Sequence, residues 1–228
     1  MSMPFYVPPE QLTKDRADFA RKGIARGRPM VVVEYTGGVL LIGENPSGSL
    51  HKTGEIYDNV AFAGVGRFHE FEMLRVAGIR YADLKGYSYE RADVTAKGLA
   101  NAYAQTLGQI FTHEMKPYEI EVMIAEVGET GDDTEIYRIQ FDGTLRDVQR
   151  FGAMGGMEDD LTERLESTLD DLPDLGEAIR VAADTVEGVM ESSVAAEDWE
   201  AAVLDRTASR RRKFIRLEPA EIAEFRGQ

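Results

Sequence analysis

The amino-acid sequence predicts an α+β fold in which antiparallel sheets lie between layers of helices. Three observations support this class: helices are expected in pairs between groups of strands, hairpin signals join neighbouring strands, and helices do not alternate singly with strands. A doubly wound parallel sheet requires such alternation, so the sequence argues against it. With 228 residues and a hydrophobic share of 43%, the chain can form one globular domain with a large core.

The N-terminal end is expected to be an extended tail followed by a helix. Pro4 and Pro8 interrupt the apolar first eight residues and disfavour a helix there. Pro9 can occupy the first turn of a helix, which we expect to run to about Arg26 and to stop at Gly27. One face of this helix carries Leu12, Phe19, Ala20 and Ile24. The chain is therefore divided into a tail, residues 1–8, and a single domain, residues 9–228.

A β-hairpin follows this helix. The valine-rich stretch Met30–Tyr35 predicts a strand, residues 36–38 turn the chain, and Val39–Gly43 pairs back. One or two further short strands are expected between Ile56 and Val65. A helix from about Phe68 to Ala82 comes next.

The middle of the chain predicts a long helix and then more strands. We expect Asp93 to cap this helix, which reaches Met115 and ends before Pro117. Strands are expected at Tyr118–Val127 and Glu135–Phe141. The buried stripe of the helix is expected to consist of Leu99, Tyr103, Leu107, Ile110 and Phe111.

The last third predicts two acidic amphipathic helices and two closing strands. A strand leads into the glycine-rich residues 152–156, where a helix opens with acids in its first turn. Met157, Leu161, Leu165 and Leu169 lie on one face of it. Asp174 and Glu177 have the spacing of a capping box for the next helix. Strands at residues 202–204 and 214–217 and a short helix at residues 219–225 complete the order. The face of the second helix that we expect to be buried carries Leu175, Ile179, Ala182, Val186 and Met190.

Composition excludes several classes of function. A formal charge of −15 argues against nucleic acid and against anionic membrane surfaces as partners. The chain has no cysteine, which excludes disulfides, thiolate metal sites and cysteine nucleophiles. The three histidines lack the spacing of a metal site, and no G-x-S-x-G motif occurs. Without a secretory signal pattern, the chain is expected in the cytoplasm.

Several segments together resemble the α-type subunits of actinobacterial 20S proteasomes. They are Phe19–Ile24, the hairpin Val31–Ile42, Glu44–Lys52, Ala61–Phe68, Leu99–Gly108, Lys116–Val122 and Met154–Gly156. The resemblance covers nearly the whole chain and is weakest after about Glu218. It implies a four-layer αββα sandwich of two antiparallel sheets, the N-terminal-nucleophile hydrolase fold, in agreement with the paired helices.

The resemblance also implies that this chain is not itself a peptidase. Catalytic β-type relatives begin their first strand with a threonine, whose hydroxyl attacks the peptide carbonyl while its free α-amine acts as base. Here Arg28 stands at that position, followed by Pro29, and Glu44 stands where those relatives carry an aspartate. Gly27-Arg28 offers no hydroxyl for self-cleavage. No catalytic residue, metal ligand or cofactor is therefore expected.

Two family roles fall on residues of this chain. Lys52 matches the lysine that lines the pocket between neighbouring α subunits and pairs with the C-terminal carboxylate of an activator. The tail that closes the axial pore corresponds to Ser2, Met3, Pro4, Phe5, Tyr6, Val7 and Pro8. The implied partners are other α subunits in a homo-heptameric ring, the β subunit, a ring ATPase activator and tagged protein substrates.

Two rival interpretations remain open at this point. The first is an active threonine peptidase of the same fold, as in a β-type subunit, which would lose its leader on maturation. The second is a structural scaffold without a proteolytic partner. The residue at the start of the first strand, Arg28, is the feature that argues against the first.

Overall fold

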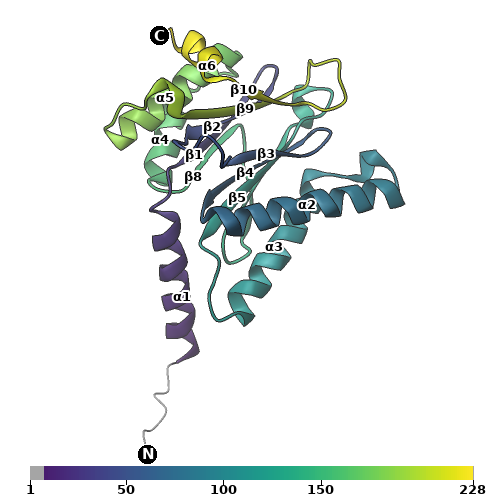
Figure 1. The fold of residues 1–228 in the computed structure, drawn as a ribbon, viewed down its shortest axis with the longest axis vertical. Helices are drawn as coiled ribbons and strands as arrows, with labels where there is room; N and C mark the ends of the chain where they lie inside the picture. Colours follow the sequence, from purple (N-terminus) through teal and green to yellow (C-terminus); the bar gives the residue numbers. More distant parts are fainter. Residues whose placement is uncertain (1–7, 228) are drawn as a thin grey trace, which may run out of the picture.

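The computed structural model describes residues 8–227, and these form a sandwich of two sheets covered by helices on both outer faces (Figure 1). The strand orders are β10-β9-β2-β1-β8 and β3-β4-β5-β6-β7, with every neighbouring pair antiparallel. The predicted fold class is thereby confirmed. The strands of the first sheet are β1 (Met30–Tyr35), β2 (Gly38–Glu44), β8 (Phe151–Met154), β9 (Trp199–Asp205) and β10 (Phe214–Leu217). Those of the second are β3 (Thr53–Tyr57), β4 (Val60–Gly66), β5 (Ile120–Glu126), β6 (Glu135–Ile139) and β7 (Leu145–Asp147).

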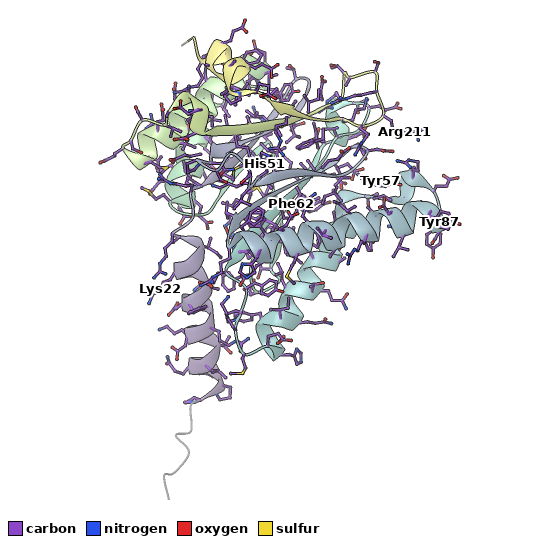
Figure 2. The ribbon with its side chains drawn as sticks, in the orientation of Figure 1. Lys22, His51, Tyr57, Phe62, Tyr87 and Arg211 are labelled. Carbon is purple, nitrogen blue, oxygen red and sulfur yellow. The ribbon has the colours of Figure 1, made fainter. Side chains whose placement is uncertain are left out.

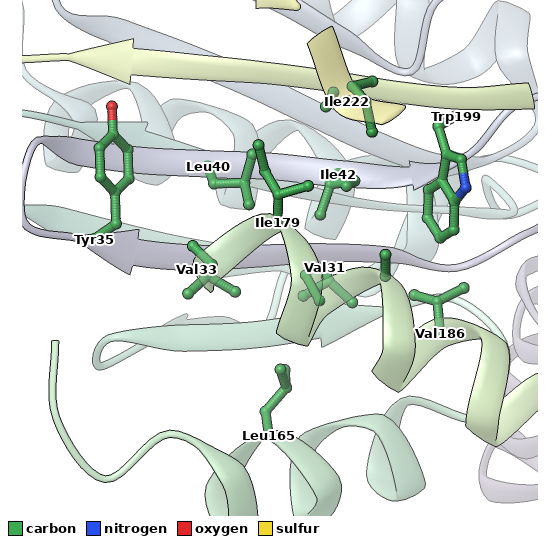
Figure 3. Close-up of a cluster of buried hydrophobic side chains, with 14 of the residues drawn as sticks. Val31, Val33, Tyr35, Leu40, Ile42, Leu165, Ile179, Val186, Trp199 and Ile222 are labelled. Atoms are coloured by element: carbon green, nitrogen blue, oxygen red, sulfur yellow. The ribbon is translucent and has the colours of Figure 1, made fainter. Parts of the chain in front are cut away.

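Helices α4 (Glu158–Thr168), α5 (Leu175–Met190) and α6 (Pro219–Arg226) cover the first sheet. Figure 3 shows Ile179 of α5 among the side chains of β1 and β2. The burial of such apolar clusters is the main stabilising contribution to a domain of this kind. The labelled members of this cluster are Val31, Val33, Tyr35, Leu40, Ile42, Leu165, Ile179, Val186, Trp199 and Ile222.

The second sheet is covered by α2 (Phe68–Ser88) and α3 (Ala96–His113). A separate cluster joins the inner faces of the two sheets, where Val32 and Leu41 meet Ala63 and Met123. The far end of α2 projects beyond the sheets, and Tyr87 there is exposed (Figure 2). Short 3-10 turns complete the described structure at η1 (Arg91–Asp93), η2 (Gly131–Asp133) and η3 (Ala196–Asp198). Within residues 8–227, no helix has both the length and the apolar character needed to cross a bilayer.

Helix α1 (Pro9–Ile24) extends away from the sandwich (Figure 1). Only its last turns reach the sheets, where Ala20 and Ile24 are buried. Leu12 and Phe19, which share the predicted apolar face, are 52% and 45% exposed. The helix also ends at Ile24, two residues before the predicted Arg26. At Leu12 and Phe19, helix α1 therefore presents apolar surface that the described residues of this chain cover only in part.

Further details of the predicted helices are wrong, including the end of α2, which lies at Ser88 and not at about Ala82. Thr95, and not Asp93, caps α3, because the Asp93 carboxylate accepts the N–H of Glu90 and closes the preceding 3-10 turn. That helix ends at His113, short of Met115. Met157 precedes α4 in the left-handed conformation, with φ of 60°, and is exposed, so it does not share the buried face of Leu161 and Leu165.

The predicted first hairpin is confirmed. Met30 lies opposite Gly43 and Tyr35 opposite Gly38, so β2 begins one residue before the predicted Val39. This pairing brings the residue segments just before β1 and at the end of β2 together. The loop that leads into β3 lies at the same end of the sandwich, since Lys52 of this loop contacts Glu44 at the end of β2.

Candidate functional site

Three segments converge where β1 begins. The Arg28 guanidinium donates to the Glu44 carboxylate, with 2.7 Å between Nη1 and Oε2. Lys52, in the loop before β3, donates from Nζ to the backbone carbonyls of Arg28 and Glu44, each at 2.8 Å. Figure 2 marks this loop by His51, which neighbours Lys52 in the sequence. The structure therefore unites Arg28, Glu44 and Lys52, which the sequence identified separately.

Burial of Lys52 lowers the pKa of its ammonium from 10.5 to about 8. The carboxylates of Glu200 and Glu44 oppose this effect, while the Arg28 guanidinium adds to it. Lysine has three donors, and two are used on carbonyls within the described part of the chain. The third leaves Lys52 able to hold an anionic group such as a carboxylate.

The start of β1 lacks what threonine-type peptide cleavage requires. Arg28 and Pro29 precede the strand, and neither carries a hydroxyl. Their backbone continues into α1, and the N–H of Gly27 donates to the carbonyl of Ile24 at 2.9 Å. A free α-amine to act as base is therefore absent from this position in the described chain. The site can bind an anion, but it cannot perform acyl transfer through an N-terminal hydroxyl.

The patterns in the sequence did not identify Glu200, the residue that holds the Lys52 loop in place. Glu200 of β9 is buried, and its carboxylate accepts the backbone N–H groups of Lys52 and Thr53 at 3.1 and 2.9 Å. Glu200 lies 148 residues from Lys52 in the chain, so no local spacing could have linked them. Only the pairing of β9 with β2 brings the two residues to the same end of the sandwich.

The expected gate residues Ser2 to Val7 lie outside the described residues. Pro8 is described, is exposed, and has extended backbone with φ of −56° and ψ of 142°. Its carbonyl accepts the N–H of Leu12 at 3.1 Å, which starts α1. The described part of the chain thus begins at the exposed end of α1, remote from the sheets (Figure 1).

Comparison with known proteins gives a consistent family. A family model described as "Proteasome subunit" matches residues 24–204, from the end of α1 into β9. "Proteasome subunit alpha" of Xylanimonas cellulosilytica is 54% identical over 237 residues, which span 100% of this chain and 97% of the relative. The proteins of the same name from Nocardioides sp. and Thermomonospora curvata are each 52% identical; they cover 100% and 99% of this chain, and 91% and 98% of their own lengths.

Alpha-type subunits are the non-catalytic members of the threonine protease complex, and Arg28 at the start of β1 is consistent with that class. With both the matched family model and full-length relatives above 50% identity, the chain belongs to the proteasome subunit family, as a non-catalytic subunit of the alpha type.

Proposed function

We propose that this chain forms the outer, heptameric rings of a proteasome core, gates entry to the chamber of β-type subunits, and docks a ring ATPase. The observation that carries this proposal is the Lys52 ammonium, held at the end of the sandwich by two carbonyl acceptors. Beside it, Arg28 and Pro29 lead into β1, and neither side chain is a nucleophile. A cation without a nucleophile suits binding of an anionic group and not its chemical conversion.

The ligand of Lys52 in this proposal is the C-terminal carboxylate of an activator subunit. A lysine ammonium binds a carboxylate as a point charge. A partly desolvated lysine forms a stronger ion pair than a lysine in bulk water. Copies of the pair repeated around a ring would act together through avidity. The partners are accordingly a ring ATPase, β-type subunits, further copies of this chain and tagged protein substrates, in the cytoplasm.

The gate in this proposal is the tail, residues 1–8, ahead of the single domain, residues 9–228. Phe5, Tyr6 and Val7 supply apolar surface that one copy cannot bury alone. Pro4 and Pro8 keep the tail from becoming part of the helix. Around a ring axis, several such tails can bury their side chains against each other and close the pore.

The test is a Lys52→Ala variant assembled with its β-type partner. We expect intact rings by native mass spectrometry but at least about a tenfold loss of ATPase-dependent degradation of a tagged protein, because the lost contact is repeated around the ring. Lys97→Ala, which removes an exposed lysine of α3, is the matched control and should degrade the same substrate at the normal rate. Unchanged degradation by Lys52→Ala would exclude this role for Lys52.

A further inference from the structure

We infer that Glu200 of β9 is a positioning residue for Lys52 and pre-organises the loop that presents its ammonium to a carboxylate ligand. The inference rests on the proposed role of Lys52 and adds a residue that has no direct part in binding. Glu200 acts through the backbone of the loop, across the boundary between the two sheets.

The carboxylate of Glu200 accepts hydrogen bonds from the two backbone N–H groups that flank the Lys52 Cα. Its Oε2 accepts the N–H of Lys52 at 3.1 Å, and its Oε1 accepts the N–H of Thr53 at 2.9 Å. The hydroxyl of Thr53 donates to the same Oε1, and the side-chain amide of Asn45 donates to Oε2, each at 2.5 Å. Two consecutive backbone amides fixed in this way determine where the lysine side chain begins.

Arg216 of β10 is a second side chain that holds the Lys52 loop, together with Glu200. Its Nη1 donates to Glu200 Oε1 at 2.9 Å and to the Thr53 hydroxyl at 3.0 Å, while Nη2 donates to the Thr53 carbonyl at 3.0 Å. Arg216 lies opposite Ala202 in the β9–β10 pair, so both anchoring side chains come from one sheet. The residues that they hold begin the edge strand of the other sheet.

Asn45 connects the first residues of the loop to the same Glu200 carboxylate. Its side-chain amide also donates to the carbonyl of Leu50 at 2.7 Å, and its Oδ1 accepts the N–H of Ser47 at 3.2 Å. The loop from Asn45 to Thr53 is therefore tied at both ends to one buried carboxylate.

Glu200 is charged in this environment. Burial alone would raise the pKa of its carboxyl, but the hydrogen bonds from Thr53, Lys52 and Asn45 outweigh burial and lower that pKa below its ordinary value. Its negative charge in turn favours the ammonium form of Lys52, against the desolvation of the lysine. A glutamine cannot replace it, because an amide NH₂ would face donors at one of the two positions.

A structural role alone would give a different outcome from a positioning role. If Glu200 only joined the two sheets, its loss would weaken the binding of acid and amide peptides equally, or would lower the stability of the particle without changing its preference for the acid. If Glu200 positions Lys52, its loss removes the preference for a free carboxylate. That preference is measurable with two synthetic peptides that carry the last eight residues of the ATPase subunit, one as the free acid and one as the C-terminal amide.

The experiment measures the apparent Kd of both peptides for assembled particles by fluorescence anisotropy. Unchanged particles should prefer the acid by about tenfold, since one charge-assisted contact is at stake. Lys52→Ala and Glu200→Gln should each bring the preference to about one, and Glu200→Gln should leave the Kd of the amide unchanged. In the double variant the preference should equal that of Lys52→Ala, because both residues act through one contact.

Glu70→Gln is the matched control. Glu70, in α2 beside the other sheet, is buried like Glu200, and its carboxylate accepts the backbone N–H of Glu119 and the ammonium of Lys116. This variant should keep the preference for the acid. If Glu200→Gln particles do not assemble, Thr53→Val is the test variant. It deletes the Thr53 hydroxyl, which donates to Glu200 and accepts from Arg216, keeps the backbone N–H that Glu200 accepts, and should lower the preference for the acid by about threefold.

Three results would overturn the inference. The first is a full acid preference in Glu200→Gln particles, or in Thr53→Val particles where the former fail to assemble. The second is an equal loss of acid and amide binding, which would mark Glu200 as structural only. In both cases Lys52→Ala still loses the preference, so the proposed function survives. If Lys52→Ala itself keeps the acid preference, the proposed role of Lys52 fails, and this inference falls with it.

Discussion

The side chains of Arg28 and Glu44 form an ion pair, with 2.7 Å between Nη1 and Oε2, at the open end of the β1–β2 hairpin. The Glu44 side chain is 9% exposed and that of Arg28 is 49% exposed, so the pair lies at the rim of the sandwich. Lys52 donates to the backbone carbonyl of each partner. The end of the fold at which catalytic relatives need a free threonine is thus occupied by an arginine, a glutamate and a lysine.

The purified chain should neither cleave itself nor hydrolyse peptides. The reason is that Arg28-Pro29 provides no hydroxyl and the backbone continues into α1. Intact-mass spectrometry should give the full chain after long incubation, and a fluorogenic peptide should show no turnover. Loss of the first 27 residues together with turnover would contradict the assignment to the non-catalytic class.

Binding of a carboxylate peptide to assembled particles should weaken at high pH. Lys52 is charged below its pKa of about 8 and loses its charge as the pH rises through that value. The charged groups that act on it are Glu200, Glu44 and Arg28. The affinity should be nearly constant up to about pH 7 and about fivefold lower by about pH 9, as measured by anisotropy.

Lys52→Arg is the control for this pH dependence, because arginine keeps its charge over the whole range. Particles with this substitution should bind the peptide with an affinity that does not change between about pH 7 and pH 9. A fall of equal size in both particles would assign the titration to another group.

Deletion of Ser2 to Pro8 should raise peptide hydrolysis by the assembled complex in the absence of an activator. The proposed gate rests on a few contacts between tails and not on a packed core, so its loss should admit peptides with little change in the melting temperature. The measurement is the initial rate on a short peptide for full-length and truncated particles at equal β content. Equal rates would show that this tail is not the barrier.

The cluster beneath α5 should dominate the stability of the first sheet. Ile179 is fully buried against β1 and β2 (Figure 3), so Ile179→Ala should lower the free energy of unfolding by about 2–5 kcal/mol. Leu84→Ala, at a side chain that is 68% exposed on α2, should change it by less than about 0.5 kcal/mol. Urea denaturation of the two variants compares these values directly, and equal effects would contradict the packing described above.

Local signals in the sequence predicted most of the elements. The glycines after Thr36 indicated the turn of the first hairpin, and Asp174 caps α5 as expected, with its Oδ1 2.8 Å from the N–H of Glu177. The cap of α3 was misplaced because Asp93 and Thr95 both suit a cap. The choice between them depends on the 3-10 turn that already uses the Asp93 carboxylate.

The candidate site was only partly predictable. Lys52, Arg28 and Glu44 could be identified from the resemblance to a family, but their mutual contacts follow from the stacking of two sheets. Glu200 and Arg216 reach the Lys52 loop from strands about 150 residues away, and an isolated glutamate in a strand carries no signal of its own. Contacts of this kind depend on tertiary structure, which a single sequence does not encode in any local pattern.

Native mass spectrometry of this chain co-expressed with its β-type partner tests the central claim most directly. The account predicts one large particle in which two heptameric rings of the full-length chain flank two rings of a β-type subunit that has lost its leader. A chain that remains monomeric beside mature β subunits, or that itself loses its first 27 residues within the particle, would contradict it.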